Sequence, residues 1–395
     1  MRNQRLLPLL VVAILVAPFL LLHLAPDFDT GNMFVQFAPS NAAKFLRVVL
    51  PGLAIGALLG LGLKYLGKLR ERVALPRPQL LEHPARLSAT VLIIALGGCF
   101  LGTKFLSLGT FVCLYMILSL GLNVTVGMTG LLVLGFSGFY AVGAYAFAVV
   151  QQFAPLPWWS GLPIGLLAGL LAGWLVGLPC LRLRGDYLAI ATLGFAEAFR
   201  ELVRNLSVTG SDMGINLGFP SRVHALGPLS AAQASWVFGT VLVALCALAI
   251  HRLYHSRIGR AWIAVREDEV AAASMGIPVV RLKLLAFSVS AGLAGLAGAF
   301  FAGFTGFVDP STSTFDQSVL ILAMVILGGL GSLSGSLLGA ALLYLAPNLL
   351  RDAIPEISDY RLLFFGFLLV AMMLFRPQGL LGASRHRSEL EGGKA

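Results

Sequence analysis

The sequence predicts an all-α, polytopic helical membrane protein with about ten transmembrane helices. Hydrophobic residues make up 58% of the 395 residues, and charged residues only 12%. Apolar runs of about 18 or more residues recur along the chain, and a helix of that length can cross a bilayer. Strand-length alternation of polar and apolar residues, typical of outer-membrane barrels, is missing. The expected location is therefore an inner or plasma membrane.

Hydrophobic runs place the transmembrane helices in order. The first run follows Arg2 and Arg5 like a secretion signal, but it lacks a small-x-small cleavage site, so a retained helix is expected. The expected spans are residues 6–25, 46–66, 87–102, 105–126, 131–150, 160–181, 187–204, 235–253, 282–306 and 361–375. Within residues 319–350, two shorter apolar pieces flank the turn-rich GGLGSLSG. They predict a hairpin of short helices or a re-entrant pair.

Positive charge predicts the orientation of these helices. Most of the 28 Lys and Arg residues lie in residues 1–5, 64–86, 182–184, 251–283 and 376–394. Because such residues collect on the cytoplasmic side, both termini and residues 251–283 are expected in the cytoplasm. Residues 205–234 are then outside, provided that the charged run 187–204 crosses the membrane.

One polar segment, residues 251–283 and here called the polar loop, interrupts the C-terminal half of the chain. Acidic residues 267–269 suit a helix N-terminus, while Gly276 and Pro278 mark a stop. A helix over 267–275, roughly 14 Å long, is therefore expected outside the membrane. It could dock on a partner protein, or it could be a solvated loop that lies on the membrane surface.

Small residues recur every four positions in the span 282–306. The first ridge comprises Ala286, Ser290, Ala294, Gly298 and Ala302, and beside it lie Ala291, Gly295, Ala299 and Gly303. Such ridges let helices approach closely in lipid, so this span is expected inside the bundle or at a subunit interface.

A candidate translocation path lies in residues 121–147. Glycines break the chain there between two spans, and uncharged polar groups accompany them; broken helices at membrane depth are tolerated only inside protein or beside a water-filled cavity. The alternative is close helix packing by glycine. The path candidates are Asn123, Thr125, Gly127, Thr129, Gly130, Gly135, Ser137, Gly138 and, from a later span, Glu197. Glu197 is either a proton relay or part of an ion-paired helix end.

No catalytic residue, metal ligand set or nucleotide site is predicted for this chain. The run GGCFLGTK at 97–104 has Thr and Lys in the wrong order for a phosphate loop and lies in a membrane span. His251 and His255 have ligand-like spacing but no further ligands nearby. The four cysteines, Cys99, Cys113, Cys180 and Cys246, are interpreted as small hydrophobic residues without a disulfide. Nothing indicates a nucleic-acid partner.

Six runs together carry a family resemblance. They are GLNVTVGMTGLLVLGFSGFYAVGAY, LRLRGDYLAIATLGF, RIGRAWIAVREDEVAAASMGI, KLLAFSVSAGLAGLAGAFFAG, VILGGLGSLSG and FRPQGLLG. In this order they closely resemble the LivM-type permease subunits of bacterial branched-chain amino acid ABC transporters, over roughly residues 102–382. The resemblance implies a two-helix extension (1–85), a permease domain (86–382) and a cytoplasmic tail (383–395).

The resemblance implies that the polar loop forms a coupling helix seated on an ATPase subunit. The residues expected to carry coupling are Arg260, Arg266, Glu267, Asp268, Glu269, Ala272, Met275, Gly276 and Ile277. It also implies a LivH-like second permease subunit, two ATPases that use ATP and Mg²⁺, and a periplasmic solute-binding protein. The chain itself would be a non-catalytic subunit without a bound cofactor.

The implied substrates are leucine, isoleucine and valine, with urea, short amides or other amino acids as alternatives within the family. Two readings from other classes stay open. An ion-coupled secondary transporter needs a buried ionisable site, for which the sequence offers only Glu197. An integral membrane enzyme needs a cluster of nucleophile, base or metal ligands, which the sequence does not contain.

Overall fold

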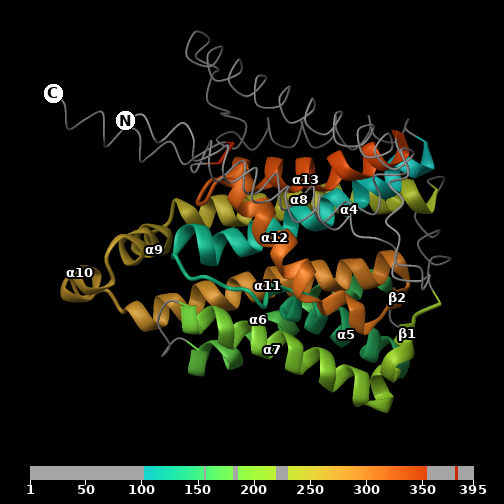
Figure 1. The fold of residues 1–395 in the computed structure, drawn as a ribbon, viewed down its shortest axis with the longest axis horizontal. Coiled ribbons are helices and arrows are strands. Elements are labelled where there is room, and N and C mark those ends of the chain that lie inside the picture. Colours follow the sequence, from blue (N-terminus) through green and yellow to red (C-terminus); the bar gives the residue numbers. More distant parts are fainter. Residues whose placement is uncertain (1–101, 155–156, 181–185, 219–229, 354–378, 381–395) are drawn as a thin grey trace, which may run out of the picture. The chain divides into compact units, whose positions relative to one another are not determined.

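The computed structural model describes residues 102–154, 157–180, 186–218, 230–353 and 379–380 (Figure 1). The expected spans 6–25, 46–66 and 361–375, all but the last residue of 87–102, the extension 1–85 and the tail 383–395 lie outside these residues. In the described part, four segments are long and apolar enough to cross a membrane, judged by length and composition. They are Thr103–Met128, Trp158–Cys180, Ala231–Tyr254 and Val279–Thr305. The expected crossings at 131–150 and 187–204 are helical for most of their length, but their passage through the membrane stays a prediction.

Helix α11 (Val279–Thr305) is the centre of the described bundle. Its predicted small-residue ridge, Ala286, Ser290, Ala294, Gly298 and Ala302, is buried along its whole length. The helix packs most extensively against α6 (Gly161–Cys180) and α5 (Phe136–Phe153), which run beside it in Figure 1. The ridge therefore faces neighbouring helices of the same chain and not lipid. This agrees with the expectation that the span lies inside the bundle.

Helix α6 carries a matching glycine ridge that the sequence analysis missed. Gly161, Gly165, Gly169, Gly173 and Gly177 are all buried. A Cβ built at Gly169 would overlap the carbonyl oxygen of Ala291 on α11, so the two backbones touch. The opposite face of α6 exposes large apolar side chains, namely Leu167, Leu171, Trp174, Leu175 and Leu178. One face of this helix thus serves packing, and the other is available to lipid or a partner.

Helix α4 (Thr103–Leu122) continues without interruption into the π-helix η3 (Asn123–Met128). Its backbone hydrogen bonds there shift from i−4 to i−5, an arrangement that is rare and often found at functional sites. Gly130, with φ of 72°, then reverses the chain, and the amide of Leu131 donates to the carbonyl of Thr125 at 3.0 Å. The predicted break in this segment is therefore real, and it begins inside the helix.

Helix α5 begins at Phe136, later than the expected residue 131. The preceding residues 129–135 are irregular, and their amides need partners outside a helix. Thr192, on α7 (Asp186–Asn205), supplies one: its hydroxyl accepts from the amides of Leu134 (3.2 Å) and Gly135 (3.4 Å). A contact between residues distant in sequence thus sets where α5 starts.

Two helices form the predicted hairpin near the C-terminus. Helix α12 (Phe315–Gly328) and helix α13 (Leu333–Ala353) are joined by a turn at residues 329–332, here called the hairpin turn. Gly329 and Gly331 adopt φ of 118° and 77° in this turn. The chain returns to the end of α12 at Leu380, whose amide donates to the carbonyl of Leu327 at 2.8 Å.

The remaining long helix, α8 (Ala231–Tyr254), runs beside α4. It begins at a capping box in which Ser230 and Gln233 exchange side-chain and backbone hydrogen bonds. Near its start, a Cβ built at Gly109 of α4 would overlap the ring of Trp236. Short 3₁₀ turns complete the described helices: Trp158–Ser160, Ser207–Thr209, Ser211–Met213 and Pro310–Ser313.

The described bundle has two different ends. Helices α9 (Arg257–Glu267) and α10 (Glu269–Ser274) lie where α11 begins, and the strands β1 (Ile215–Asn216) and β2 (Phe307–Val308) lie where it ends (Figure 1). At 1.5 Å per residue, α11 separates these ends by about 40 Å. The polar loop and the segment after α7 therefore lie at opposite ends, as the charge analysis requires.

The strands correct the all-α prediction in one detail. Strands β1 and β2 pair antiparallel, with Ile215 opposite Val308 and Asn216 opposite Phe307. They form because the chain after α11 turns at Gly306, with φ of 70°, and lies alongside the chain after α7. Strands of two residues are too short to leave an alternating hydrophobic pattern.

Candidate functional site at the polar loop and the broken helix

The polar loop folds as two helices, so the predicted single helix over 267–275 is wrong at its start. Glu267 is the last residue of α9, and Asp268 is extended, with φ of −154°. Its carboxylate accepts hydrogen bonds from the amides of Val270 (2.8 Å) and Ala271 (3.0 Å), which begins the six-residue α10. The end of the helix agrees with the prediction, because Gly276 adopts φ of 78°.

A small core of its own holds the polar loop together. Trp262 of α9 is fully buried, and its Nε1 donates to the carbonyl of Leu282 on α11 at 2.9 Å. Val265, Ala272 and Val279 form a buried cluster, with Ile277 packed against it. Two residues expected to carry coupling, Ala272 and Ile277, thus lie against the loop's interior. The amphipathic α9 was missed, although Trp262 and Val265 already have the three-residue spacing of one helix face.

The charged residues of the loop divide between internal contacts and the surface. Glu269 pairs with Lys283 on α11 at 2.6 Å, and Arg260 donates to the carbonyl of His255 at 3.3 Å. Glu267 is exposed at the end of α9.

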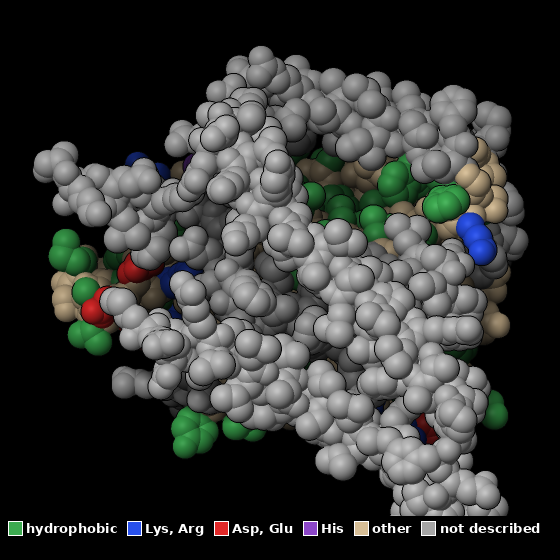
Figure 2. Space-filling view, turned by 45° about the horizontal axis from the view of Figure 1, so that its top comes forward, with side chains coloured by type: hydrophobic (Ala, Val, Ile, Leu, Met, Phe, Trp, Pro, Cys, Tyr) green, Lys and Arg blue, Asp and Glu red, His purple; other side chains and the backbone are tan. Residues whose placement is uncertain are grey.

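Two large apolar side chains lie beside these acids. Val270 is 75% exposed and Met275 is 83% exposed. We call Glu267, Val270 and Met275 the loop tip. Figure 2 shows hydrophobic and acidic side chains side by side at this end of the molecule. An exposed apolar pair flanked by acids is the surface of this segment best suited to protein contact.

Arg266 is exposed on α9, and its guanidinium reaches toward the bundle. Its Nη1 donates to the carbonyl of Gly127, which belongs to the π-helix η3. A Cβ built at Gly130 would lie 3.3 Å from the Cγ of Arg266, and a Cβ built at Gly331 would lie 3.1 Å from its Nη1. Arg266 thus joins the polar loop to the broken helix and the hairpin turn.

The path candidates near η3 are hydrogen-bonded within the bundle. Asn123 is fully buried, its Oδ1 accepts from the amide of Gly331 at 2.9 Å, and its Nδ2 donates to the carbonyl of Ser332 at 3.3 Å. The hydroxyl of Thr125 lies 3.2 Å from that of Ser290 on α11, and Thr129 donates to the carbonyl of Thr125 at 2.7 Å. These side chains hold η3 to its neighbours.

The candidates at the start of α5 form a second cluster. The hydroxyl of Ser318 on α12 donates to that of Ser137 at 2.7 Å, and Ser137 donates to the carbonyl of Thr314 at 3.0 Å. Gly135 and Gly138 lie against the backbone of α7, where a Cβ at either position would collide. For these glycines the geometry favours close packing; a role in lining the path stays a prediction.

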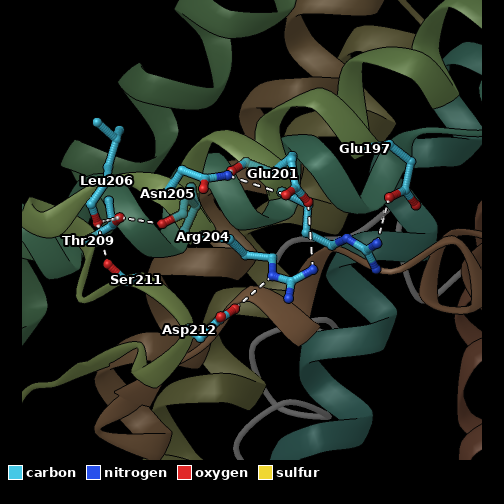
Figure 3. Close-up of polar contacts among 10 residues, drawn as sticks. Glu197, Glu201, Arg204, Asn205, Leu206, Thr209, Ser211 and Asp212 are labelled. Atoms are coloured by element: carbon cyan, nitrogen blue, oxygen red, sulfur yellow. Dashed lines mark hydrogen bonds and ion pairs between the residues drawn. The ribbon is translucent and has the colours of Figure 1, made fainter.

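Glu197 lies apart from both clusters, on a charged face in the second half of α7 (Figure 3). It pairs with Arg200 at 3.0 Å, and its side chain is 39% exposed. Arg204 continues the series with Asp212 at 2.7 Å and Glu201 at 3.6 Å. This arrangement favours an ion-paired helix end over a buried proton relay.

A metal site would need several His, Cys, Asp or Glu side chains to lie together in the described ranges. No group of three or more His, Cys, Asp or Glu side chains there could hold a metal ion. His251 and His255 contact each other edge to face, with ring centroids 4.5 Å apart. Cys113, Cys180 and Cys246 are buried free thiols.

Long apolar helices packed through small residues, with a polar loop braced at one end, define a polytopic helical membrane protein. The chain matches the family described as "Branched-chain amino acid transport system / permease component" over residues 104–373. It therefore belongs to this family of permease components.

Individual relatives agree with this family. The chain is 42% identical over 329 residues to the "High-affinity branched-chain amino acid transport system permease protein LivM" of Salmonella typhimurium, covering 77% of this chain and 76% of the relative. The LivM of Escherichia coli strain K12 has the same identity and coverage. The LivH permease of Escherichia coli strain K12 is 29% identical over 147 residues, covering 37% of this chain and 46% of the relative. No solved structure matches the chain significantly.

Proposed function

We propose that this chain is the transmembrane permease subunit of an ATP-driven ABC importer for the branched-chain amino acids leucine, isoleucine and valine. Its membership in the permease family and its 42% identity to two LivM proteins support this function. In this proposal the chain performs no catalysis. Partner ATPases bind ATP and Mg²⁺ and hydrolyse the nucleotide.

The proposed complex contains a second permease subunit of the LivH type, two ABC ATPases and a periplasmic solute-binding protein. The likeness to LivH supports a pair of related permeases that build one translocation path between them. Selectivity would then rest largely with the binding protein. Urea, short amides or other amino acids are the alternative substrates.

One observation carries the coupling role, namely the loop tip. Val270 and Met275 expose large apolar surface, while the loop beneath them is braced by its own core and by the pair of Glu269 with Lys283. A rigid knob with an apolar, acid-flanked tip suits insertion into a cleft of an ATPase. Movement of that ATPase would then open the bundle alternately to each side of the membrane.

The proposed location is the bacterial inner membrane, with about ten transmembrane helices and both termini in the cytoplasm. The polar loop is then cytoplasmic, and the segment 205–218 lies outside. The separation of these two segments to opposite ends of α11 supports this orientation. An ion-coupled mechanism is less well supported, because Glu197 is ion-paired and partly exposed.

Uptake by the complex reconstituted in vesicles tests this function. Leucine uptake should require ATP, should not follow an imposed proton or sodium gradient, and should be competed by valine but not by urea or an acidic amino acid. Uptake driven by a gradient alone would contradict the ABC assignment, and competition by urea alone would contradict the substrate.

A matched pair of variants tests the loop tip. Val270→Asp places a charge on the proposed contact, and Val208→Asp makes the same change at the opposite end of the bundle, where Val208 is 48% exposed. Only Val270→Asp should lose co-purification of the ATPases. Equal retention of the ATPases by both variants would show that the ATPases do not contact the loop tip.

A further inference from the structure

Three segments that are distant in sequence meet at the side chain of Arg266. The arginine lies at the end of α9, and its hydrogen-bond acceptor, Gly127, is 139 residues away in η3. The hairpin turn contributes Gly331, next to the same guanidinium. This junction connects the polar loop with the one π-helical segment among the described residues.

Arg266 supplies a hydrogen-bond donor to one of the last carbonyls of η3. The carbonyl of Thr125 accepts from the amide of Leu131 and from the hydroxyl of Thr129. The carbonyl of Gly127 instead accepts from Arg266. A cation at a helix C-terminus satisfies a terminal carbonyl and interacts favourably with the helix dipole. A charge-assisted hydrogen bond is also stronger than a neutral one.

Glycines make the space for this contact. Gly130 and Gly331 have φ of 72° and 77°, which side-chain-bearing residues rarely adopt. A Cβ at Gly127 would lie only 2.5 Å from the amide nitrogen of Gly331, so the π-helix and the hairpin turn touch directly. A movement of the arginine therefore acts on both segments together.

The loop can deliver such a movement as a unit. Trp262, Val265 and Ala272 are buried within it, and Arg266 lies next to Glu267 of the exposed loop tip. A force applied at α10 is thus carried to α9, and so to Arg266, through the packed side chains of Ala272 and Val265. The π-helix can respond, because it differs from an α-helix by a one-residue shift in its hydrogen bonds.

We propose that Arg266 is a positioning residue that transmits movement of the polar loop to η3 and the hairpin turn, and through them to the translocation path. This role rests on the proposed function, because it needs an ATPase to move the loop. It differs from the sequence-based expectation, in which Arg266 contacts the ATPase directly.

The test uses the full complex in vesicles with Arg266→Ala, Arg266→Lys and the control Arg257→Ala, which removes an exposed arginine from the first turn of the same helix. The first readout is leucine imported per ATP hydrolysed. The second is the labelling rate of a cysteine placed at Ser334, next to the hairpin turn, with and without ATP. A residue that only stabilises the fold would not alter the ATP-dependent change in labelling.

Arg266→Ala should hydrolyse ATP, import about tenfold less leucine per ATP and lose the ATP-dependent change in labelling. Arg266→Lys should fall between this variant and the wild type, because an ammonium can reach the carbonyl but lacks the guanidinium fork. Arg257→Ala should match the wild type. Wild-type coupling and labelling in Arg266→Ala would overturn the proposal.

Two further outcomes are also decisive. If Arg266→Ala does not assemble, Arg266→Lys decides: reduced coupling supports the role, and coupling equal to that of Arg257→Ala overturns it. If the wild-type complex hydrolyses ATP without importing leucine, the proposed substrate is wrong. The labelling comparison then still decides the role of Arg266.

Discussion

The backbone of α5 at Tyr140 occupies the place where a side chain of Gly298 would begin. A Cβ at Gly298 would overlap the carbonyl oxygen of Tyr140 and lie 2.8 Å from the amide nitrogen of Ala144. Helices α5 and α11 therefore meet backbone to backbone at this point. In lipid, where burial between helices gains little, such contact is the main source of helix association.

This contact predicts that Gly298→Ala destabilises the protein, because either helix must move to accept the methyl group. The expected loss is about 1 to 3 kcal/mol, measured as a lower unfolding temperature in detergent. Gly194→Ala is the matched control, because nothing lies within 4 Å of a Cβ there. Equal unfolding temperatures for the two variants would show that α5 and α11 are not in contact.

The hydroxyl of Thr192 supports the irregular segment before α5, so Thr192→Val should leave the amides of Leu134 and Gly135 without this acceptor. We expect a loss of about 1 to 3 kcal/mol. Thr110→Val is a matched control, because the buried hydroxyl of Thr110 donates to the Leu106 carbonyl of its own helix. The prediction fails if Thr110→Val lowers the unfolding temperature as much as Thr192→Val.

Removal of the Asp268 cap should loosen α10 without unfolding the bundle. Asp268→Ala should cost the short helix about 1 kcal/mol and speed amide hydrogen exchange at Val270 and Ala271, whereas Asp268→Asn should retain most of the protection. Hydrogen exchange of the complex, followed by mass spectrometry, measures the exchange rates of these amides in the two variants. Unchanged exchange in the alanine variant would mean that packing alone forms the helix.

The two ends of the bundle should differ in their access from outside the cell. A cysteine at Met213, which is 87% exposed, should react with an impermeant thiol reagent in intact cells. A cysteine at Ser274, exposed on α10, should react only after the membrane is opened. Labelling of both in intact cells would contradict the orientation inferred from the positive charges.

Periodic features of this protein were predictable, and contacts between distant segments were not. The ridge on α11 was found because small residues repeat every four positions. The equally regular glycines of α6 carry the same signal and could have been found the same way. The start of α5 depends on Thr192, and the orientation of Arg266 depends on Gly127; neither partner is near in sequence, so local patterns do not reveal them.

Local choices between similar residues were also hard to predict. Three consecutive acids at 267–269 each suit a helix N-terminus. The structure uses the second as the cap, so Glu267 ends α9, and α10 begins at Glu269, two residues after the predicted start.

The hydrogen bond from Leu380 to Leu327 has a consequence for biosynthesis. Gly379, with φ of 76°, lies against Gly329, so the end of α12 receives a backbone partner from Leu380, which follows α13 in the chain. A ribosome must therefore translate the chain through α13 and on to Leu380 before the hairpin turn is complete. Until then the junction with Arg266 lacks one of its supports, and a chain truncated before residue 379 never acquires it.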